Sequence, residues 1–308
     1  MYKNIRTDLA IENREIYNQA KNAEDEIPGV KVETEQKNNI KITRVIIETK
    51  EGEEALNKPV GRYITLDIPN IYEMTAEDEY LISENISKEL KLLFDKKPES
   101  VLVVGLGNEN ITADSLGPKV IDNIDVTRHI LEYAPEEIEP NSIAVSAIAP
   151  GVMGMTGIES SEIIKGIVDK IKPDALIAID ALAARRVERI NKTVQISNSG
   201  IHPGSGVGNR RKGLTQQTVG IPVIAIGIPT VVETAVLVND SLELFIDKLQ
   251  KENKSNQTLN ELRQMENYEK IRDSLISTEY NLIVTPKEID DLIENMKDMV
   301  ARGINLAF

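Results

Sequence analysis

The sequence predicts an α/β fold in which a mostly parallel sheet is flanked by helices. Apolar runs of the length expected for buried parallel strands occur at 100–107, 143–150, 174–180 and 221–229. Between two of these runs, residues 159–173 have an amphipathic helical pattern that ends at a proline. Such alternation of strands and helices is typical of an α/β layer, in which reactive groups gather at the carboxyl ends of the strands.

Other segments extend this layer. Residues 40–67 are rich in Ile, Val, Thr and Tyr, and they predict an additional, smaller β-containing subregion. Residues 75–94 change to a helical period, with Thr75 as the expected N-cap. Residues 250–274 are strongly polar, which predicts an exposed helix or a flexible insertion.

The C-terminal region predicts a further helix over residues 285–303. Thr285 and Glu288 have the spacing of a capping box, and Pro286 occupies the expected first helical position. Gly303 is expected to end the helix.

Composition limits the possible functions. The chain has 308 residues and a formal net charge of −14, which argues against direct nucleic-acid binding because that requires a cationic surface. Cysteine is absent, so disulfides, thiolate metal sites and cysteine nucleophiles are excluded. We find no apolar run near the roughly 20 residues of a membrane span and no secretory signal, so we expect a soluble cytoplasmic protein with no membrane contact.

The stretch "VLVVGLGNENITADSLGPKV" joins a predicted strand to a predicted helix. It lacks the third glycine of a dinucleotide fingerprint, since Asn110 stands at that position, and it lacks the Gly-Lys-Ser/Thr of a phosphate loop. What remains is a glycine turn that presents Asp114 just before a helix that Pro118 helps to begin. Asp114 is therefore either an N-cap of that helix or a reactive carboxylate.

A second carboxylate, Asp180, stands at the end of the apolar run 174–180. A charged residue at such a position needs a partner: Asp180 caps the next helix, pairs with Arg185 or Arg186, or faces Asp114 in one crevice. Two carboxylates held close together retain one shared proton. One can then act as base towards water and the other as acid, which hydrolyses an amide without a metal or cofactor.

Several long motifs carry a family resemblance that covers nearly the whole chain. They are "VLVVGLGNENITADSLGPKV", "VTRHI", "AIAPGVMGMTGIESSEIIKGI", "PDALIAIDALAARRVERINKTVQISNSGIHPGSGVGNRRKGL", "GIPVIAIGIPTVV" and "NLIVTPKEIDDLIENM". Together they resemble the germination protease of spore-forming bacteria.

The resemblance implies an endopeptidase of atypical aspartic type that cuts after acidic residues and degrades small acid-soluble spore proteins during germination. Its two implicated aspartates fall on Asp114 and Asp180. It also implies a homotetramer of the spore core, made as an inactive zymogen, and a fold similar to that of hydrogenase maturation proteases.

The zymogen property can be compared with the N-terminal segment. Substrates of the family have an acidic residue before the cut, then an apolar residue, an alanine and a later glutamate. "RTDLAIE" matches this order, with Asp8 before and Leu9 after the expected cut. We therefore expect a propeptide over residues 1–8 and a single protease domain over residues 9–308.

The segment "GIHPGSGVGNRRKGL" is a glycine-rich, cationic loop. It is either a substrate-binding loop that offers backbone N–H groups to the peptide or a solvated surface loop. The candidate residues in it are His202, Gly204, Gly206, Arg210 and Arg211.

Two other functions compete with the carboxylate protease. In a metal-dependent endopeptidase of the hydrogenase-maturation type, Asp114 and Asp180 would hold a divalent ion, with His202 nearby. In a non-catalytic scaffold on the same fold, neither aspartate would affect proteolysis.

Overall fold

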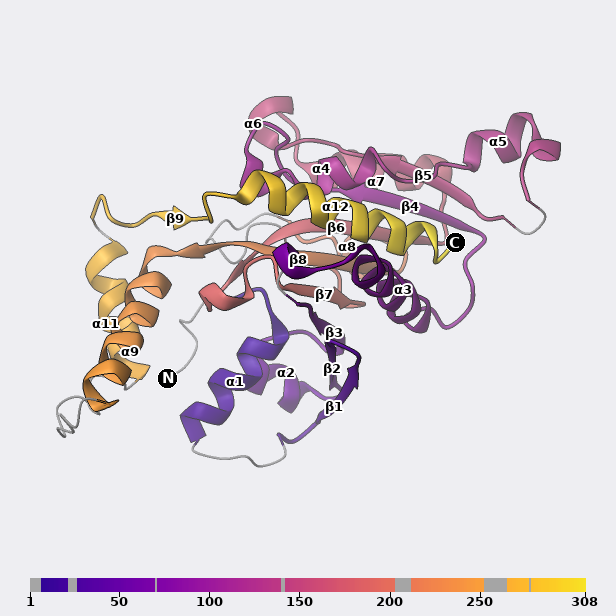
Figure 1. Ribbon diagram of the computed structural model, residues 1–308. Helices are drawn as coiled ribbons and strands as arrows, with labels where there is room; N and C mark the ends of the chain where they lie inside the picture. The colour runs from indigo at the N-terminus through magenta and orange to yellow at the C-terminus, as the bar shows by residue number, and fades with distance from the viewer. Residues whose placement is uncertain are drawn as a thin grey trace.

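The computed structural model describes residues 7–21, 27–69, 71–139, 142–202, 212–251, 265–276 and 278–308. Within these residues nine strands form one mixed sheet in the order β1-β2-β3-β7-β8-β6-β4-β5, with β9 paired to β8 (Figure 1). The strands are β1 (Val30–Lys37), β2 (Ile40–Ile47), β3 (Gly61–Asp67), β4 (Ser100–Gly105), β5 (Ala144–Ile148), β6 (Ala175–Ala184), β7 (Thr193–Ser197), β8 (Val223–Glu233) and β9 (Ile283–Val284).

The α/β prediction is confirmed, and the parallel pairing is confined to one part of the sheet. The four apolar runs form β4, β5, β6 and β8, which pair in parallel. Pairings that involve β1, β2, β3, β7 and β9 are antiparallel. The predicted β-containing subregion at 40–67 contributes β2 and β3, which extend the same sheet through the β3–β7 pairing.

Helices cover both faces of the sheet. The described helices are α1 (Ala10–Lys21), α2 (Lys50–Leu56), α3 (Ala76–Leu92), α4 (Leu116–Ile121), α5 (Arg128–Tyr133), α6 (Met153–Thr156), α7 (Ser160–Ile171), α8 (Gln216–Val219), α9 (Thr234–Lys251), α11 (Met265–Ile276) and α12 (Ile289–Asn305). One apolar cluster joins α3, α4 and α12 to one face, and a second joins α1, α2, α7 and α8 to the other.

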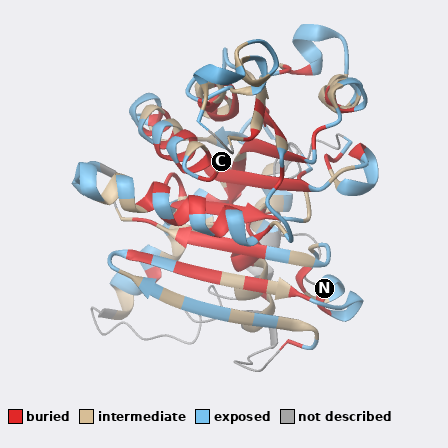
Figure 2. Ribbon diagram, turned by 90° about the vertical axis from the view of Figure 1, so that its right-hand side faces the viewer, coloured by how far each residue is buried: buried red, intermediate tan, exposed pale blue. Residues whose placement is uncertain are grey.

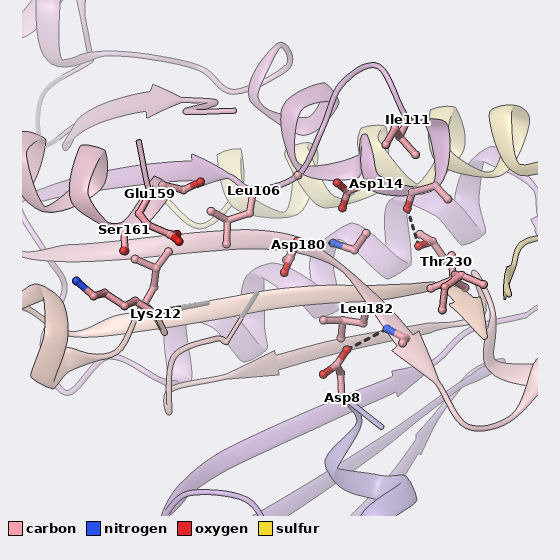
Figure 3. Close-up of a pocket in the computed structure, with 18 residues that line it drawn as sticks. Asp8, Leu106, Ile111, Asp114, Glu159, Ser161, Asp180, Leu182, Lys212 and Thr230 are labelled. Carbon is pink, nitrogen blue, oxygen red and sulfur yellow. Dashed lines mark hydrogen bonds between the residues drawn. The ribbon is translucent and has the colours of Figure 1, made fainter. Parts of the chain in front are cut away.

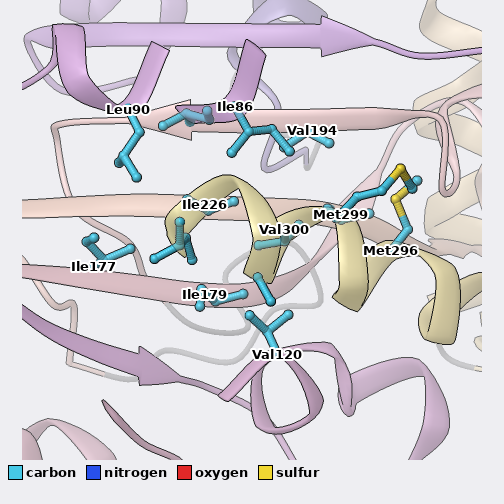
Figure 4. Close-up of a cluster of buried hydrophobic side chains, with 14 of the residues drawn as sticks. Ile86, Leu90, Val120, Ile177, Ile179, Val194, Ile226, Met296, Met299 and Val300 are labelled. Atoms are coloured by element: carbon cyan, nitrogen blue, oxygen red, sulfur yellow. The ribbon is translucent and has the colours of Figure 1, made fainter. Parts of the chain in front are cut away.

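Alternation along the strands produces these two clusters, because successive side chains of a strand point to opposite faces. In β6, Ile177 and Ile179 lie in the cluster under α12, whereas Leu176 and Ala178 lie in the cluster under α7 (Figure 4). Figure 2 shows buried residues along the central strands and mostly exposed or intermediate ones along β1, the outermost strand. The central strands are therefore buried on both faces by the two apolar clusters.

The structure confirms one predicted helix boundary, at Thr75, and contradicts two others, at Thr285 and Gly303. Thr75 caps α3 as predicted, with its hydroxyl accepting from Asp78 N. The capping box at Thr285 is wrong: the Thr285 hydroxyl donates to the Thr230 carbonyl oxygen at 2.8 Å, and α12 begins only at Ile289. Gly303 lies inside α12 instead of ending it.

The position of Gly303 has a packing reason. A Cβ on this residue would lie 2.7 Å from the Ile86 side chain of α3, so the glycine permits close contact between the two helices.

In the polar region 250–274, residues 265–274 belong to α11 and residues 252–264 lie outside the described residues. None of the helices in the described residues is long and apolar enough to cross a membrane.

Candidate active site

The glycines that follow β4 bring a helix close to the sheet. A Cβ on Gly105 would lie 2.2 Å from the Gly117 carbonyl oxygen, and a Cβ on Gly117 would lie 2.2 Å from the Leu106 carbonyl oxygen. Gly107 has φ +116°, and its Cβ would lie 2.0 Å from the Asp114 carbonyl oxygen. These glycines thus serve close backbone packing of α4 and of the turn before it.

That turn positions Asp114. Asn108 N donates to the Asp114 carboxylate at 2.8 Å and to its carbonyl oxygen at 3.1 Å. The N-cap of α4 is Ser115, so Asp114 closes the turn and does not cap the helix. From β8, the buried Thr230 hydroxyl donates to the Ala113 carbonyl oxygen at 2.7 Å and holds the 3-10 helix η2 (Thr112–Asp114) against the sheet.

Asp180 occupies the middle of β6, just past the end of β4. Gly105, the last residue of β4, pairs with Ile179, so Asp180 stands where the neighbouring strand has stopped. It is only 4% exposed, and its Oδ1 accepts from Ala181 N at 3.0 Å. The end of β4 therefore opens the space beside a buried carboxylate.

Asp114 and Asp180 line one cavity of about 320 Å³ (Figure 3). Asp8 and Glu159 also line it, so four carboxylates surround the same space. Apolar groups form much of the remaining wall, including Leu106, Ile111, Leu182, Leu214, Val231 and Ile283. Such a cavity suits a peptide that must be partly desolvated while carboxylates act on it.

The N-terminal segment reaches this cavity at Asp8, in a short irregular stretch that precedes α1. Asp8 N donates to the Ala183 carbonyl oxygen at 3.2 Å, and Ala183 N donates to the Asp8 carboxylate at 3.0 Å. Leu9 and Ala10 follow directly and are fully buried in the apolar cluster on the α7 face. The residues on both sides of the predicted cut are thus held against β6.

Glu12 anchors the same segment four residues after Asp8. Its carboxylate is fully buried and accepts from the Thr7 hydroxyl, from Arg185 N at 2.8 Å and from Arg186 N at 3.1 Å. The Arg189 guanidinium lies 3.5 Å away. Burial raises the pKa of Glu12 above its ordinary value, although the hydrogen bonds from Thr7 and Arg185 and the Arg189 charge act in the opposite direction.

The glycine-rich loop is only partly described. Gly204, Gly206, Arg210 and Arg211 lie outside the described residues. His202, at the start of the loop, is exposed and lines a smaller neighbouring cavity that also contacts Asp8. His202 does not line the cavity of Asp114 and Asp180.

Across the part of the chain that the structure describes, no three histidine or carboxylate side chains gather in the way that a metal ion requires.

Several residues of the site were not predicted from the sequence. Glu159 and Lys212 line the aspartate cavity from the start of α7 and from the end of the glycine-rich loop. Thr230 supports η2 from β8. The sequence contains a signal for Thr230, because this threonine directly follows the apolar run 221–229. Glu159, in contrast, looks like an ordinary polar residue at the start of a helix.

Comparisons with known proteins point to one family over nearly the whole chain. The family model described as germination protease matches residues 10–266 and 250–308. A germination protease from Caldanaerobacter subterraneus subsp. tengcongensis is 50% identical over 98% of this chain and 94% of its own length. Those of Clostridium tetani and Priestia megaterium are 47% and 44% identical, each over 98% of this chain and 95% and 93% of their own lengths.

Among solved structures, a [NiFe] hydrogenase maturation protease, HycI from Thermococcus kodakarensis, is similar with a TM-score of 0.29 and 17% identity. The match covers 46% of this chain and 80% of that one. On the family match and the full-length relatives, the chain belongs to the germination protease family and is a peptidase.

Proposed function

We propose that this peptidase is an aspartic-type endopeptidase that cuts after acidic residues, with Asp114 and Asp180 as its catalytic pair. The observation that carries the proposal is that both carboxylates line one cavity, which the N-terminal segment also enters at Asp8. Asp114 comes from a turn and Asp180 from a strand, so their shared location results from the fold and not from proximity in the chain.

The proposed reaction uses one carboxylate as base and the other as acid. Water attacks the carbonyl carbon of the substrate and gives its proton to the ionised carboxylate. The protonated carboxyl then gives its proton to the peptide nitrogen, and the carbon–nitrogen bond breaks. The products are a new carboxylate and a new amino terminus, and the pair again holds one proton between its two members.

The proposed substrates are small acid-soluble spore proteins, degraded in the spore core during germination. The common name of the relatives, germination protease, supports this role.

We further propose that the enzyme is made as a zymogen and processes itself between Asp8 and Leu9. The docking of Asp8 along β6, with Leu9 buried beside it, supports this cut, because Asp8 lines the cavity that also holds the two aspartates.

Self-processing is directly measurable. The purified full-length chain, incubated at mildly acidic pH, is expected to lose residues 1–8 and to acquire Leu9 as its N-terminus. Intact-mass spectrometry and N-terminal sequencing follow the change, and hydrolysis of a spore-protein substrate should increase in parallel. A chain that keeps Met1 and is already fully active would contradict the zymogen proposal.

Docking of the N-terminal segment is expected to strengthen as pH falls. Burial raises the pKa of Glu12 in the docked state above its ordinary 4.5, so docking takes up a proton between those two values. Docking therefore weakens as pH rises through the docked pKa, by up to about tenfold per pH unit. Hydrogen exchange at Leu9–Glu12, corrected for intrinsic rates and measured in an Asp180→Asn chain that stays unprocessed, should show this change.

Glu12→Gln is the matched control for this pH dependence. The amide keeps the shape of the carboxylic acid but does not titrate, so the protection of the segment should no longer change with pH. If the glutamine variant retains the same pH dependence, a different group is responsible.

The proposed assembly is a homotetramer. The elements α9, α11 and β9 lie together at one end of the molecule (Figure 1). Large apolar side chains in α9, in β9 and in the segment just before β9 are exposed. They are Leu237, Val238, Leu244, Phe245, Tyr280, Leu282 and Ile283. Exposed apolar groups gathered in one region support a subunit contact there, because association would remove them from water.

A further inference from the structure

The carbonyl oxygen of Asp8 receives two hydrogen bonds from side chains far apart in the sequence. Lys58 Nζ donates to it at 2.9 Å, and Gln195 Nε2 donates to it at 3.0 Å. Lys58 follows α2, whereas Gln195 lies on β7, so two separate elements converge on a single oxygen atom. This oxygen belongs to the peptide bond between Asp8 and Leu9.

The amide of Gln195 is held in one orientation. Its Oε1 accepts from Ala10 N at 2.7 Å, which directs its Nε2 towards Asp8. Gln195 is 8% exposed, and it stands in a strand whose neighbouring side chains are buried. A polar side chain fixed at both ends in this way is a preorganised donor.

The ammonium group of Lys58 is enclosed although the residue as a whole is half-buried. It lies at a cavity of about 60 Å³ that Asp8, Tyr63 and Gln195 also line. Burial holds the pKa of Lys58 below its ordinary value, although the negative charges of Asp8 and Glu12 act in the opposite direction. An enclosed cation is rare without a function or a partner, and here it points at a peptide carbonyl.

Gln195 lies in the same row of the sheet as Asp180. Gln195 pairs with Gly227 on β8, and Gly227 pairs with Asp180 on β6. Two strand spacings of about 4.8 Å separate their backbones, and directly paired residues point to the same face. Gly227 contributes no side chain to this row, and Leu182 fills the space that its Cβ would occupy.

Asp8 stands at the junction of two cavities. It lines the cavity of Asp114 and Asp180, and it also lines the smaller cavity of Lys58 and Gln195. Asp8 is therefore a residue common to the cavity of the carboxylates and the cavity of the two donors. Amide hydrolysis needs donors at the carbonyl oxygen and a base near the carbonyl carbon, and Asp8 lines the cavity that holds each set of groups.

We propose that Lys58 and Gln195 bind and polarise the carbonyl oxygen of the peptide bond that the enzyme cuts. When water attacks the carbonyl carbon, the oxygen gains negative charge, and the Lys58 ammonium and the Gln195 amide stabilise it. When the carbon–nitrogen bond breaks, the electron pair returns to re-form the carbonyl and both donors are released unchanged. This assignment rests on the proposed cut between Asp8 and Leu9.

A substrate protein would place the carbonyl of its acidic residue on the same two donors. The class of ligand is therefore an extended peptide that presents a main-chain carbonyl, with its acidic side chain reaching Ala183 N as Asp8 does.

The test measures self-processing of full-length variants by intact mass under single-turnover conditions. Lys58→Met removes one donor, and Gln195→Glu removes the other while retaining an oxygen for Ala10 N. Each is expected to slow processing by on the order of 10²–10³-fold. Hydrogen exchange at Leu9–Glu12 should show that the segment stays docked in both variants.

Thr65→Val is the matched control. Thr65 is the cross-strand partner of Gln195 on β3 and is fully buried, but its hydroxyl has no hydrogen-bond partner among the described residues. This variant changes a polar group in the same row without touching Asp8, and it should process at the rate of the unmodified chain. Thermal unfolding of all three variants checks that they fold. Because both donors act on the same oxygen atom, one folded donor variant is enough to test whether they act in catalysis.

Two outcomes overturn the roles assigned to Lys58 and Gln195 but leave the proposed cut between Asp8 and Leu9 intact. If the unmodified chain is cut after Asp8 and both donor variants are equally fast, the donors do not act in catalysis. If processing slows only as much as docking of the segment weakens, the donors merely anchor it. A chain that is never cut between Asp8 and Leu9 overturns the proposed processing and this assignment together.

Discussion

Replacing Asp180 by asparagine is expected to reduce both self-processing and cleavage of substrate proteins by on the order of 10²–10⁴-fold, the range for loss of a general acid or base. The substitution preserves shape, because an asparagine oxygen can still accept from Ala181 N. What it removes is the ability to hold or release a proton in the cavity shared with Asp114. Asp114→Asn should have an effect of similar size.

The measurement is the single-turnover rate of each variant at several pH values. If the two aspartates act as one unit, the double variant should be little slower than either single variant, because removal of one member already disables the pair. Asp174→Asn is the control: Asp174 precedes the same strand, is exposed, and bonds to Glu99 N and Ser100 N instead of facing the cavity. An Asp180→Asn chain as active as this control would contradict the proposed role.

Replacing Gly107 by alanine is expected to have the next largest effect. A side chain at φ +116° is strained, and its Cβ would lie 2.0 Å from the Asp114 carbonyl oxygen. The turn must shift to relieve this overlap, and it carries Asp114 with it. We expect activity to fall by about 10²-fold, since a displacement of about 1 Å of a reacting group has an effect of that size.

The same variant should be destabilised by about 1–3 kcal/mol, which is typical of a residue forced into a disfavoured backbone conformation. Thermal and denaturant unfolding measure this loss. Gly154→Ala is the control, because a Cβ there has open space around it and the residue is outside the cavity. Full activity in Gly107→Ala would show that Asp114 need not be held in its present position.

Elements with a strong local pattern were predictable from the sequence. The four apolar runs form the parallel strands, and the helical pattern at 159–173 forms α7. Their periodicity reflects burial on one or both faces, which depends mainly on the order of apolar and polar residues. The antiparallel extension was not predictable in the same way, because the pairing of β3 with β7 joins residues more than a hundred positions apart.

Helix ends depended on competition between local and distant partners. Thr75 has Asp78 as its capping partner within the same turn, so the local prediction holds. Thr285 has an equally suitable local sequence, yet its hydroxyl bonds to the main chain of Thr230 on β8. The Thr285 side chain is thus directed at the sheet, and α12 begins only at Ile289, with Glu288 as its N-cap.

The candidate site shows the same division. Asp114 was predicted in a turn and Asp180 at a strand end, and the family motifs implied both residues. The strand-end position of Asp180 is wrong, because β6 continues to Ala184, but the structure places both aspartates at one cavity. Lys58 and Gln195 were not identified, because a lysine in a loop and a glutamine in a strand have no distinctive local pattern. Their relation to Asp8 exists only after β3, β7 and the N-terminal segment have come together.

By itself, the amino-acid sequence determined the layered α/β architecture and the family, and it predicted the two candidate aspartates, because periodicity and motifs are properties of neighbouring residues. Only the tertiary structure decided that Asp8 lies between the aspartate cavity and two donors, and that Glu12 is buried beneath Arg189. The physical reason is that burial and hydrogen bonding depend on distances in space, and the groups concerned are separated by 50 to 187 positions in the chain.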